Sequence, residues 1–155
     1  MELNLKELIP NNASSLVKLI KKVMKETDYI TVSSVPNQQE VKESIDQIYD
    51  SKFNELVGAF IDDVLIGYGR IDFHDDISEL GLVVEKKYWH LGIGTEIIKF
   101  LLGWFKEVSP QSKLYLEVKK ENSRAIKLYE YLGFSYVRKT GEAYIYEIKK
   151  DDISE

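Results

Sequence analysis

A short apolar run that leads into a pair of glycines is the first feature of this sequence that could do chemistry. Leu82-Val83-Val84 has the composition of a buried strand, and a polar loop joins it to Gly92-Ile93-Gly94-Thr95. An apolar helix is predicted to begin there. Glycines let the backbone approach a ligand closely, and a helix N-terminus offers unpaired N–H groups and a positive dipole end. The segment therefore predicts an anion site suited to a diphosphate, although two glycines could also serve the turn alone.

Two better-known glycine motifs do not fit this segment. A Rossmann fingerprint needs a third glycine and follows the first strand of its fold, whereas this turn comes in the middle of the chain. A P-loop needs Gly-Lys-Ser/Thr, and Gly94-Thr95-Glu96 stands here instead.

Two segments in register resemble the GNAT superfamily of N-acetyltransferases. The first is a strand ending at Val84, followed by the helix-opening loop at residues 89–94. The second comprises residues 114–118 and 122–134, with the pattern Leu-x-Glu-Val, Asn, Ala-Ile, Leu-Tyr, Gly-Phe. The resemblance covers residues 54–149 well. Trp89 and His90 depart from it, because the family usually has Arg or Gln and then Gly at these places.

The resemblance implies an acyl-CoA site, with acetyl-CoA as cosubstrate and no metal ion. The family fold holds CoA in a V-shaped split between the fourth and fifth strands. There a strand edge pairs with the pantetheine arm, and loop amides hold the diphosphate. Asn122 would contact the pantetheine side, but it also fits a helix cap. The implied cofactor-binding residues are Leu82, Val83, Val84, Trp89, His90, Leu91, Gly92, Ile93, Gly94, Thr95, Asn122 and Arg124.

The implied reaction is direct attack of a neutral amine on a thioester in a ternary complex. An alkyl amine has a pKa near about 10.4, so losing its proton at pH 7 costs about 4–5 kcal/mol, and a carboxylate can accept that proton. Tyr129 matches the family's general acid, although its helical spacing also fits a packed core tyrosine. Glu117 matches a glutamate that serves as base in one branch of the family, and Glu79 is its rival; either could be an ordinary strand residue.

The hydrophobic spacing predicts an α/β fold in the order β-α-α-β-β-β-α-β-α-β-β, with a mixed sheet. Residues 1–150 are expected to form a single domain, and residues 151–155 a loose tail. Residues 28–36, including Tyr29, are expected to form a loop that shapes the acceptor site. The predicted elements of the motif region are strands at 77–84 and 113–118 and helices at 94–108 and 122–132.

Composition narrows the function further. The chain of 155 residues has no cysteine and two histidines, which disfavours thiolate chemistry and most metal sites. Its net charge of −5 disfavours nucleic acid and suits a cationic amine acceptor. No apolar stretch is long enough to span a membrane, and the first residues do not resemble a signal peptide, so a cytoplasmic protein is expected. A homodimer and a catalytically silent CoA-binding sensor or interaction domain remain open alternatives.

Overall fold

The computed structural model describes residues 2–27 and 36–154, and its elements follow the predicted order. The predicted loop at residues 28–36, with Tyr29, lies outside the described residues except for Pro36. The strands and helices are β1 (Leu3–Glu7), α1 (Ala13–Glu26), α2 (Gln38–Ile48), β2 (Glu55–Ile61), β3 (Val64–His74), β4 (Ile77–Val84), α3 (Ile93–Glu107), β5 (Lys113–Lys119), α4 (Ser123–Tyr131), β6 (Ser135–Thr140) and β7 (Ala143–Lys149).

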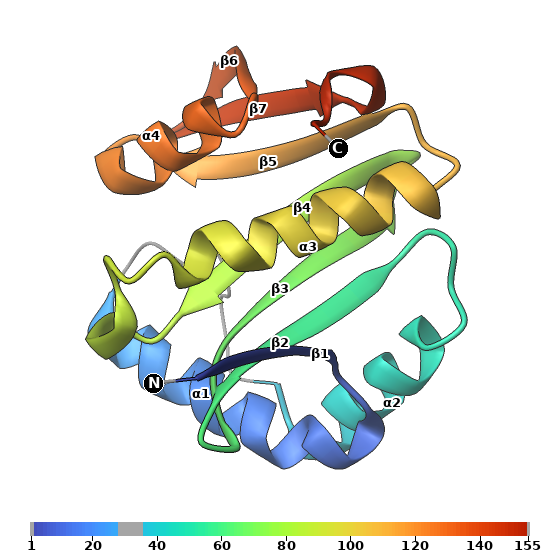
Figure 1. Ribbon diagram of the computed structural model, residues 1–155, viewed down its shortest axis with the longest axis vertical. Coiled ribbons are helices and arrows are strands. Elements are labelled where there is room, and N and C mark those ends of the chain that lie inside the picture. The colour runs from blue at the N-terminus through green and yellow to red at the C-terminus, as the bar shows by residue number, and fades with distance from the viewer. Residues whose placement is uncertain (1, 28–35, 155) are drawn as a thin grey trace.

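The strands form one seven-stranded sheet in the order β1-β2-β3-β4-β5-β7-β6 (Figure 1). All neighbours are antiparallel except β4 and β5, which are parallel. These two strands pair only from Ser78–Leu80 to Leu114–Leu116, so their later residues diverge. The predicted V-shaped split between the fourth and fifth strands is therefore confirmed.

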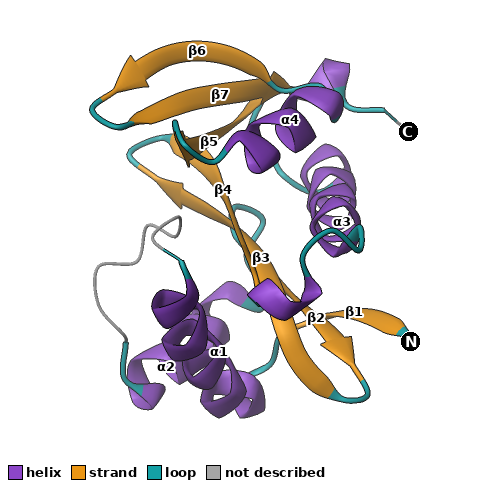
Figure 2. Ribbon diagram, turned by 90° about the vertical axis from the view of Figure 1, so that its left-hand side faces the viewer, coloured by secondary structure: helices purple, strands orange, loops and turns teal. Residues whose placement is uncertain are grey.

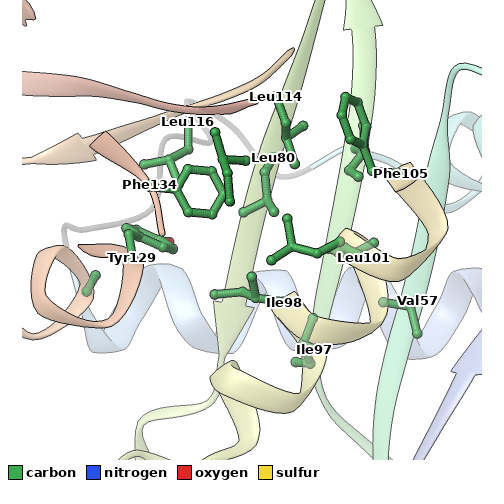
Figure 3. Packing of buried hydrophobic residues seen from close by; sticks show 14 of the residues in the cluster. Val57, Leu80, Ile97, Ile98, Leu101, Phe105, Leu114, Leu116, Tyr129 and Phe134 are labelled. Carbon is green, nitrogen blue, oxygen red and sulfur yellow. The ribbon is translucent and has the colours of Figure 1, made fainter. Parts of the chain in front are cut away.

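Helices cover both faces of the sheet (Figure 2). α3 and α4 lie on one face, where the core includes Ile97, Leu101 and Phe105, all fully buried (Figure 3). α1 and α2 lie on the other face, over β2 and β3, and pack through a second apolar cluster. α3 approaches the sheet closely at Gly69, where an added Cβ would lie 2.3 Å from the Ile97 side chain.

Turn and cap residues explain where the elements begin and end. Asp62-Asp63 and Asp75-Asp76 adopt positive φ in the turns that join β2 to β3 and β3 to β4, a conformation that Asp tolerates better than most residues. Asn37 caps α2 by accepting the Glu40 N–H at 2.8 Å. Gly133, with φ of 106°, ends the α4 turn as predicted.

The end of the chain differs from the expected loose tail. Residues Lys150–Asp152 form a short 3-10 helix, and Ile153 is only 5% exposed because it joins the core beneath α3. Its carbonyl accepts a hydrogen bond from Lys106 Nζ at 2.8 Å. The prediction missed this because a single apolar residue among acidic ones gives no periodic signal.

Candidate active site

A cavity of about 220 Å³ opens where β4 and β5 diverge. It is bounded by the end of β4, the loop after it, the first turns of α3 and α4, and the end of α1. The lining residues are Val23, Thr27, Leu82, Val83, Val84, Tyr88, Trp89, His90, Gly92, Ile93, Gly94, Thr95, Asn122, Arg124, Ala125, Leu128 and Tyr129. Every predicted cofactor residue except Leu91 is among them; Leu91 is 54% exposed.

The loop from residue 85 to residue 92, called here the cofactor loop, brings the start of α3 to the cavity. Gly92 is the N-cap of α3 and has φ of 80°. A Cβ added at Gly92 would meet nothing within 4 Å, so this position requires glycine for its backbone conformation rather than for space. The first N–H groups of a helix have no acceptor within the helix, and here those residues border the cavity. This arrangement suits a bound anion.

Trp89 joins the two sides of the split. Its indole Nε1 donates to the Val84 carbonyl at 2.8 Å, which fixes the ring against the end of β4. The Arg124 guanidinium, from the first turn of α4, lies over the ring, 4.2 Å from its centroid. Trp89, one of the two residues that depart from the motif, therefore lies against a cation at the cavity. A carbonyl oxygen has two lone pairs, so the Val84 carbonyl can accept a second hydrogen bond.

Tyr129 is buried at the cavity and is 7% exposed. Its ring packs edge-to-face on Phe134, with centroids 5.9 Å apart (Figure 3). Burial raises the pKa of its phenol to about 12. The positive charge of nearby Arg124 acts in the opposite direction, but its effect is smaller than that of burial. The phenol therefore stays protonated at neutral pH and can donate a proton or hydrogen bond. The structure shows the core packing that the helical spacing allows, and it also places Tyr129 in the cavity lining, where a general acid would have to be.

Asn122 forms the predicted helix cap, since its Oδ1 accepts the Ala125 N–H at 3.3 Å. Its side chain also borders the cavity. The cap uses the amide oxygen, so the amide nitrogen is the group that could reach a ligand.

The two candidate bases lie outside the cavity lining, on the sheet face opposite α3 and α4. Glu79 pairs in register with Tyr115, and Glu117 is two residues beyond Tyr115, so all three share that face. Glu79 Oε1 is 2.9 Å from His74 Nε2, and this contact raises the pKa of His74. Glu117 is exposed and sits just past the last β4–β5 pair, where the split begins. Within the described residues, no ion pair engages Glu117.

Sequence reasoning missed a polar group beside these glutamates. Arg70 on β3 forms an ion pair with Asp72 and lies over Gly81 of β4, where an added Cβ would be 3.0 Å from Arg70 Nε. Strand alternation could have shown the shared face of Arg70 and Asp72, but not their place beside the split. Sequence reasoning also did not predict that Val23 and Thr27 line the cavity. The available signal was their i,i+4 spacing, which places them on one side of a helix.

The described residues contain no group of three side chains able to hold a metal ion, and no helix in the same part of the chain is long and apolar enough to cross a membrane.

Residues 24–134 match the Acetyltransferase (GNAT) family, which is more than half of the chain. The chain belongs to this acetyltransferase family. The predicted family and fold are confirmed. The predicted activity, transfer of an acetyl group, is the activity that the family's name states.

Named relatives fall within the same GNAT family. An N-alpha-acetyltransferase of Sulfurisphaera tokodaii is 34% identical over 54% of this chain, and the match spans only 53% of that protein's length. The spermine/spermidine N(1)-acetyltransferase of Bacillus subtilis strain 168 is 21% identical over 88% of this chain and 90% of its own. The fold matches that of yncA from Salmonella typhimurium, solved with its cofactor acetyl-CoA. The TM-score is 0.84 at 12% identity, covering 100% of this chain and 98% of that one.

The residues present fit acetyl-CoA. The helix-start amides and Arg124 suit a diphosphate, and the apolar strand end suits a pantetheine arm. A cavity of about 220 Å³ is smaller than the roughly 300–1,000 Å³ of a typical drug-sized site, so it would enclose only part of this ligand.

Proposed function

We propose that this chain transfers the acetyl group of acetyl-CoA to a cationic amine, with the donor bound in the cavity at the β4–β5 split. The observation that carries the proposal is that one cavity holds both the glycine turn of the cofactor loop and the buried phenol of Tyr129. Two segments far apart in sequence thereby meet at the point where the sheet opens.

Acetyl-CoA supplies a thioester, whose acyl carbon is activated toward attack by an amine. Leu82, Val83 and Val84 would line the pantetheine arm, and the amides from Gly92 to Thr95 would hold the diphosphate. The phenol of Tyr129 would donate a hydrogen bond or a proton to the departing CoA sulfur. Its raised pKa keeps the phenol protonated across the working pH range.

We assign the general base to Glu117 rather than to Glu79. Glu79 is engaged by His74 and lies where β4 and β5 are still paired. Glu117 lies where the strands separate, so a carboxylate there can reach an amine approaching from the face opposite α3. It would accept the ammonium proton directly or through a water molecule.

We propose a cationic amine as acceptor because the exposed carboxylate of Glu117 lies where the strands separate. The same face carries the carboxylates of Asp72, Glu79 and Glu147 and the cations of Arg70, Lys113, Lys119 and Arg138. The spermine/spermidine N(1)-acetyltransferase of Bacillus subtilis, which matches 88% of this chain, supports a polyamine as the acceptor. The shorter match to an N-alpha-acetyltransferase makes a peptide N-terminus the second candidate.

The test is an acceptor screen that measures thiol release from acetyl-CoA with spermidine, a peptide bearing a free N-terminus, and no acceptor. Turnover with spermidine well above the blank is expected. Turnover only with the peptide would contradict a polyamine acceptor and favour the second candidate, whereas binding of acetyl-CoA with no turnover would favour the sensor alternative. The predicted cytoplasmic location and the homodimer remain predictions.

A further inference from the structure

Two side chains on the last turns of α1 contact the start of the cofactor loop. Lys22 and Glu26 are four residues apart and therefore share one side of the helix. Lys22 Nζ forms an ion pair with the Glu85 carboxylate. Glu26 Oε1 accepts the backbone N–H of Lys86 at 3.0 Å.

The Glu85 end of this contact is buried. Glu85 is 6% exposed, whereas the Lys22 side chain is 56% exposed. A buried carboxylate without a partner costs several kcal/mol, so Lys22 offsets a cost that the loop would otherwise carry. The Glu85 N–H donates to the Ile66 carbonyl of β3 at 2.9 Å, which holds the same residue against the sheet.

The Glu26 end controls the next turn of the loop. Residues Lys86–Tyr88 form a short 3-10 helix, and its first N–H is the group that Glu26 accepts. The Lys86 carbonyl in turn accepts the Trp89 N–H at 3.1 Å. A continuous set of hydrogen bonds thus runs from Glu26 to Trp89, the residue that meets Arg124. Val23 of α1 and Thr27, the residue after the helix, line the cavity.

We propose that Lys22 and Glu26 are positioning residues that hold the cofactor loop in place for the diphosphate of the acyl donor. The inference rests on the proposed function, because it takes the cavity to be the donor site. Neither side chain lines that cavity, so neither touches reacting atoms. Their effect falls on donor affinity, since amides that are already in position lose less freedom on binding.

The experiment compares Glu26→Ala and Lys22→Met with the wild type. Lys21→Met is the matched control, because Lys21 is an exposed lysine on the same helix. Acetyl-CoA dissociation constants come from calorimetry. Values of kcat and KM are measured with acetyl-CoA and with S-acetylpantetheine, which lacks the diphosphate. The melting temperature of each variant is recorded without ligand.

Glu26→Ala is expected to weaken acetyl-CoA binding about tenfold, the size of one hydrogen bond to a charged group. Its kcat at saturating acetyl-CoA should stay within about twofold of wild type, as should its KM for S-acetylpantetheine. Lys22→Met should act in the same direction, and Lys21→Met should match wild type.

Equal weakening of both donors, or a lowered melting temperature with an unchanged acetyl-CoA constant, would overturn the inference, since a merely structural role would give those results. Glu26 is half-exposed near a helix end, so Glu26→Ala is expected to fold even if Lys22→Met does not. A wild-type chain that binds no acetyl-CoA would overturn both proposals. Normal wild-type binding with an unchanged Glu26→Ala constant would overturn this one alone.

Discussion

The cofactor loop and the polar face on the other side of the split are built in different ways. The loop is held by backbone and side-chain contacts from β3, β4 and α1, through Ile66, Val84 and Glu26. The polar face, made by Arg70, Asp72, Glu79, Tyr115 and Glu117, consists of side chains on neighbouring strands, of which Arg70 and Asp72 form an ion pair.

This difference matches the tasks proposed for the two regions. A donor shared by a whole family can be held by main-chain groups, whose positions depend on a few glycines and caps. An acceptor that varies between relatives has to be selected by side chains, which change freely on an open face. Mutations in the loop should therefore change donor affinity, and mutations on the polar face should change turnover.

The largest effect is expected at the phenol that faces the split. Tyr129→Phe should lower kcat by about 100-fold or more, a typical loss for a general acid, with acetyl-CoA affinity within about twofold. Because the pKa of Tyr129 is raised to about 12, the phenol stays protonated over the accessible range, so the pH profile of the variant should keep the wild-type shape below about pH 10. Steady-state kinetics and calorimetry check both parts. A loss under about threefold in a folded variant would leave Tyr129 a packing residue.

The next effect separates the two glutamates of the polar face. Glu117→Gln should lower kcat/KM for the amine at least tenfold near pH 7, because it removes the proposed proton acceptor. Glu79→Gln should change it less than about threefold and should instead lower the pKa of His74, whose pKa Glu79 raises in the native chain. pH–rate profiles and NMR titration of His74 measure these effects. The reverse order of the two variants would move the base to Glu79.

A backbone change in the loop should act on binding. Gly92→Ala places a side chain at φ of 80°, which costs about 1–2 kcal/mol for an L-residue, and acetyl-CoA should bind about 5- to 30-fold more weakly as the loop relaxes elsewhere. Gly103→Ala is the control, because an added Cβ there also meets nothing within 4 Å but lies in the middle of α3. It should bind normally and gain stability from helix propensity. Equal binding by the two variants would contradict a conformational role for Gly92.

The contact across the split should contribute a smaller amount. Trp89→Phe and Arg124→Met are each expected to weaken acetyl-CoA binding a few-fold. The double variant should lose less than the sum, because the stacked pair is worth about 0.5–1 kcal/mol. A double-mutant cycle by calorimetry measures the coupling. Fully additive losses would show that the two residues act separately.

The smallest effect is expected at His90, which occupies a left-handed conformation with φ of 67°. His90→Gly removes the strain of a side chain there, so the melting temperature should rise by a few degrees while acetyl-CoA affinity stays within about twofold. Scanning calorimetry and ligand titration test this. A clear loss of affinity would assign the imidazole a contact with the donor.

The sequence predicted the residues that line the cavity better than those of the polar face. Local signals predicted Gly92, Gly94, Asn122 and Tyr129. The glycines stand where a helix opens, Asn122 fits a helix cap, and Tyr129 belongs to the second motif. Predicted boundaries such as 77–84 for β4 agreed with the structure. Local patterns encode turns and caps, so they can be read without tertiary contacts.

What could not be predicted depends on residues distant in sequence. The contact between Glu26 and Lys86 spans 60 positions, and no local pattern indicates it. Trp89 looked only like a departure from the motif, because the cation that it meets lies on another helix. The burial of Ile153 likewise depends on Lys106 and the core under α3.

The central claim is that main-chain amides at the start of α3 hold the donor. It is tested most directly by titrating the ¹⁵N-labelled chain with CoA and following each backbone amide by NMR. The account predicts that the largest shifts occur from Gly92 to Thr95, with smaller shifts in the first turn of α4. Saturable binding that leaves those four amides unchanged and moves amides elsewhere would contradict it.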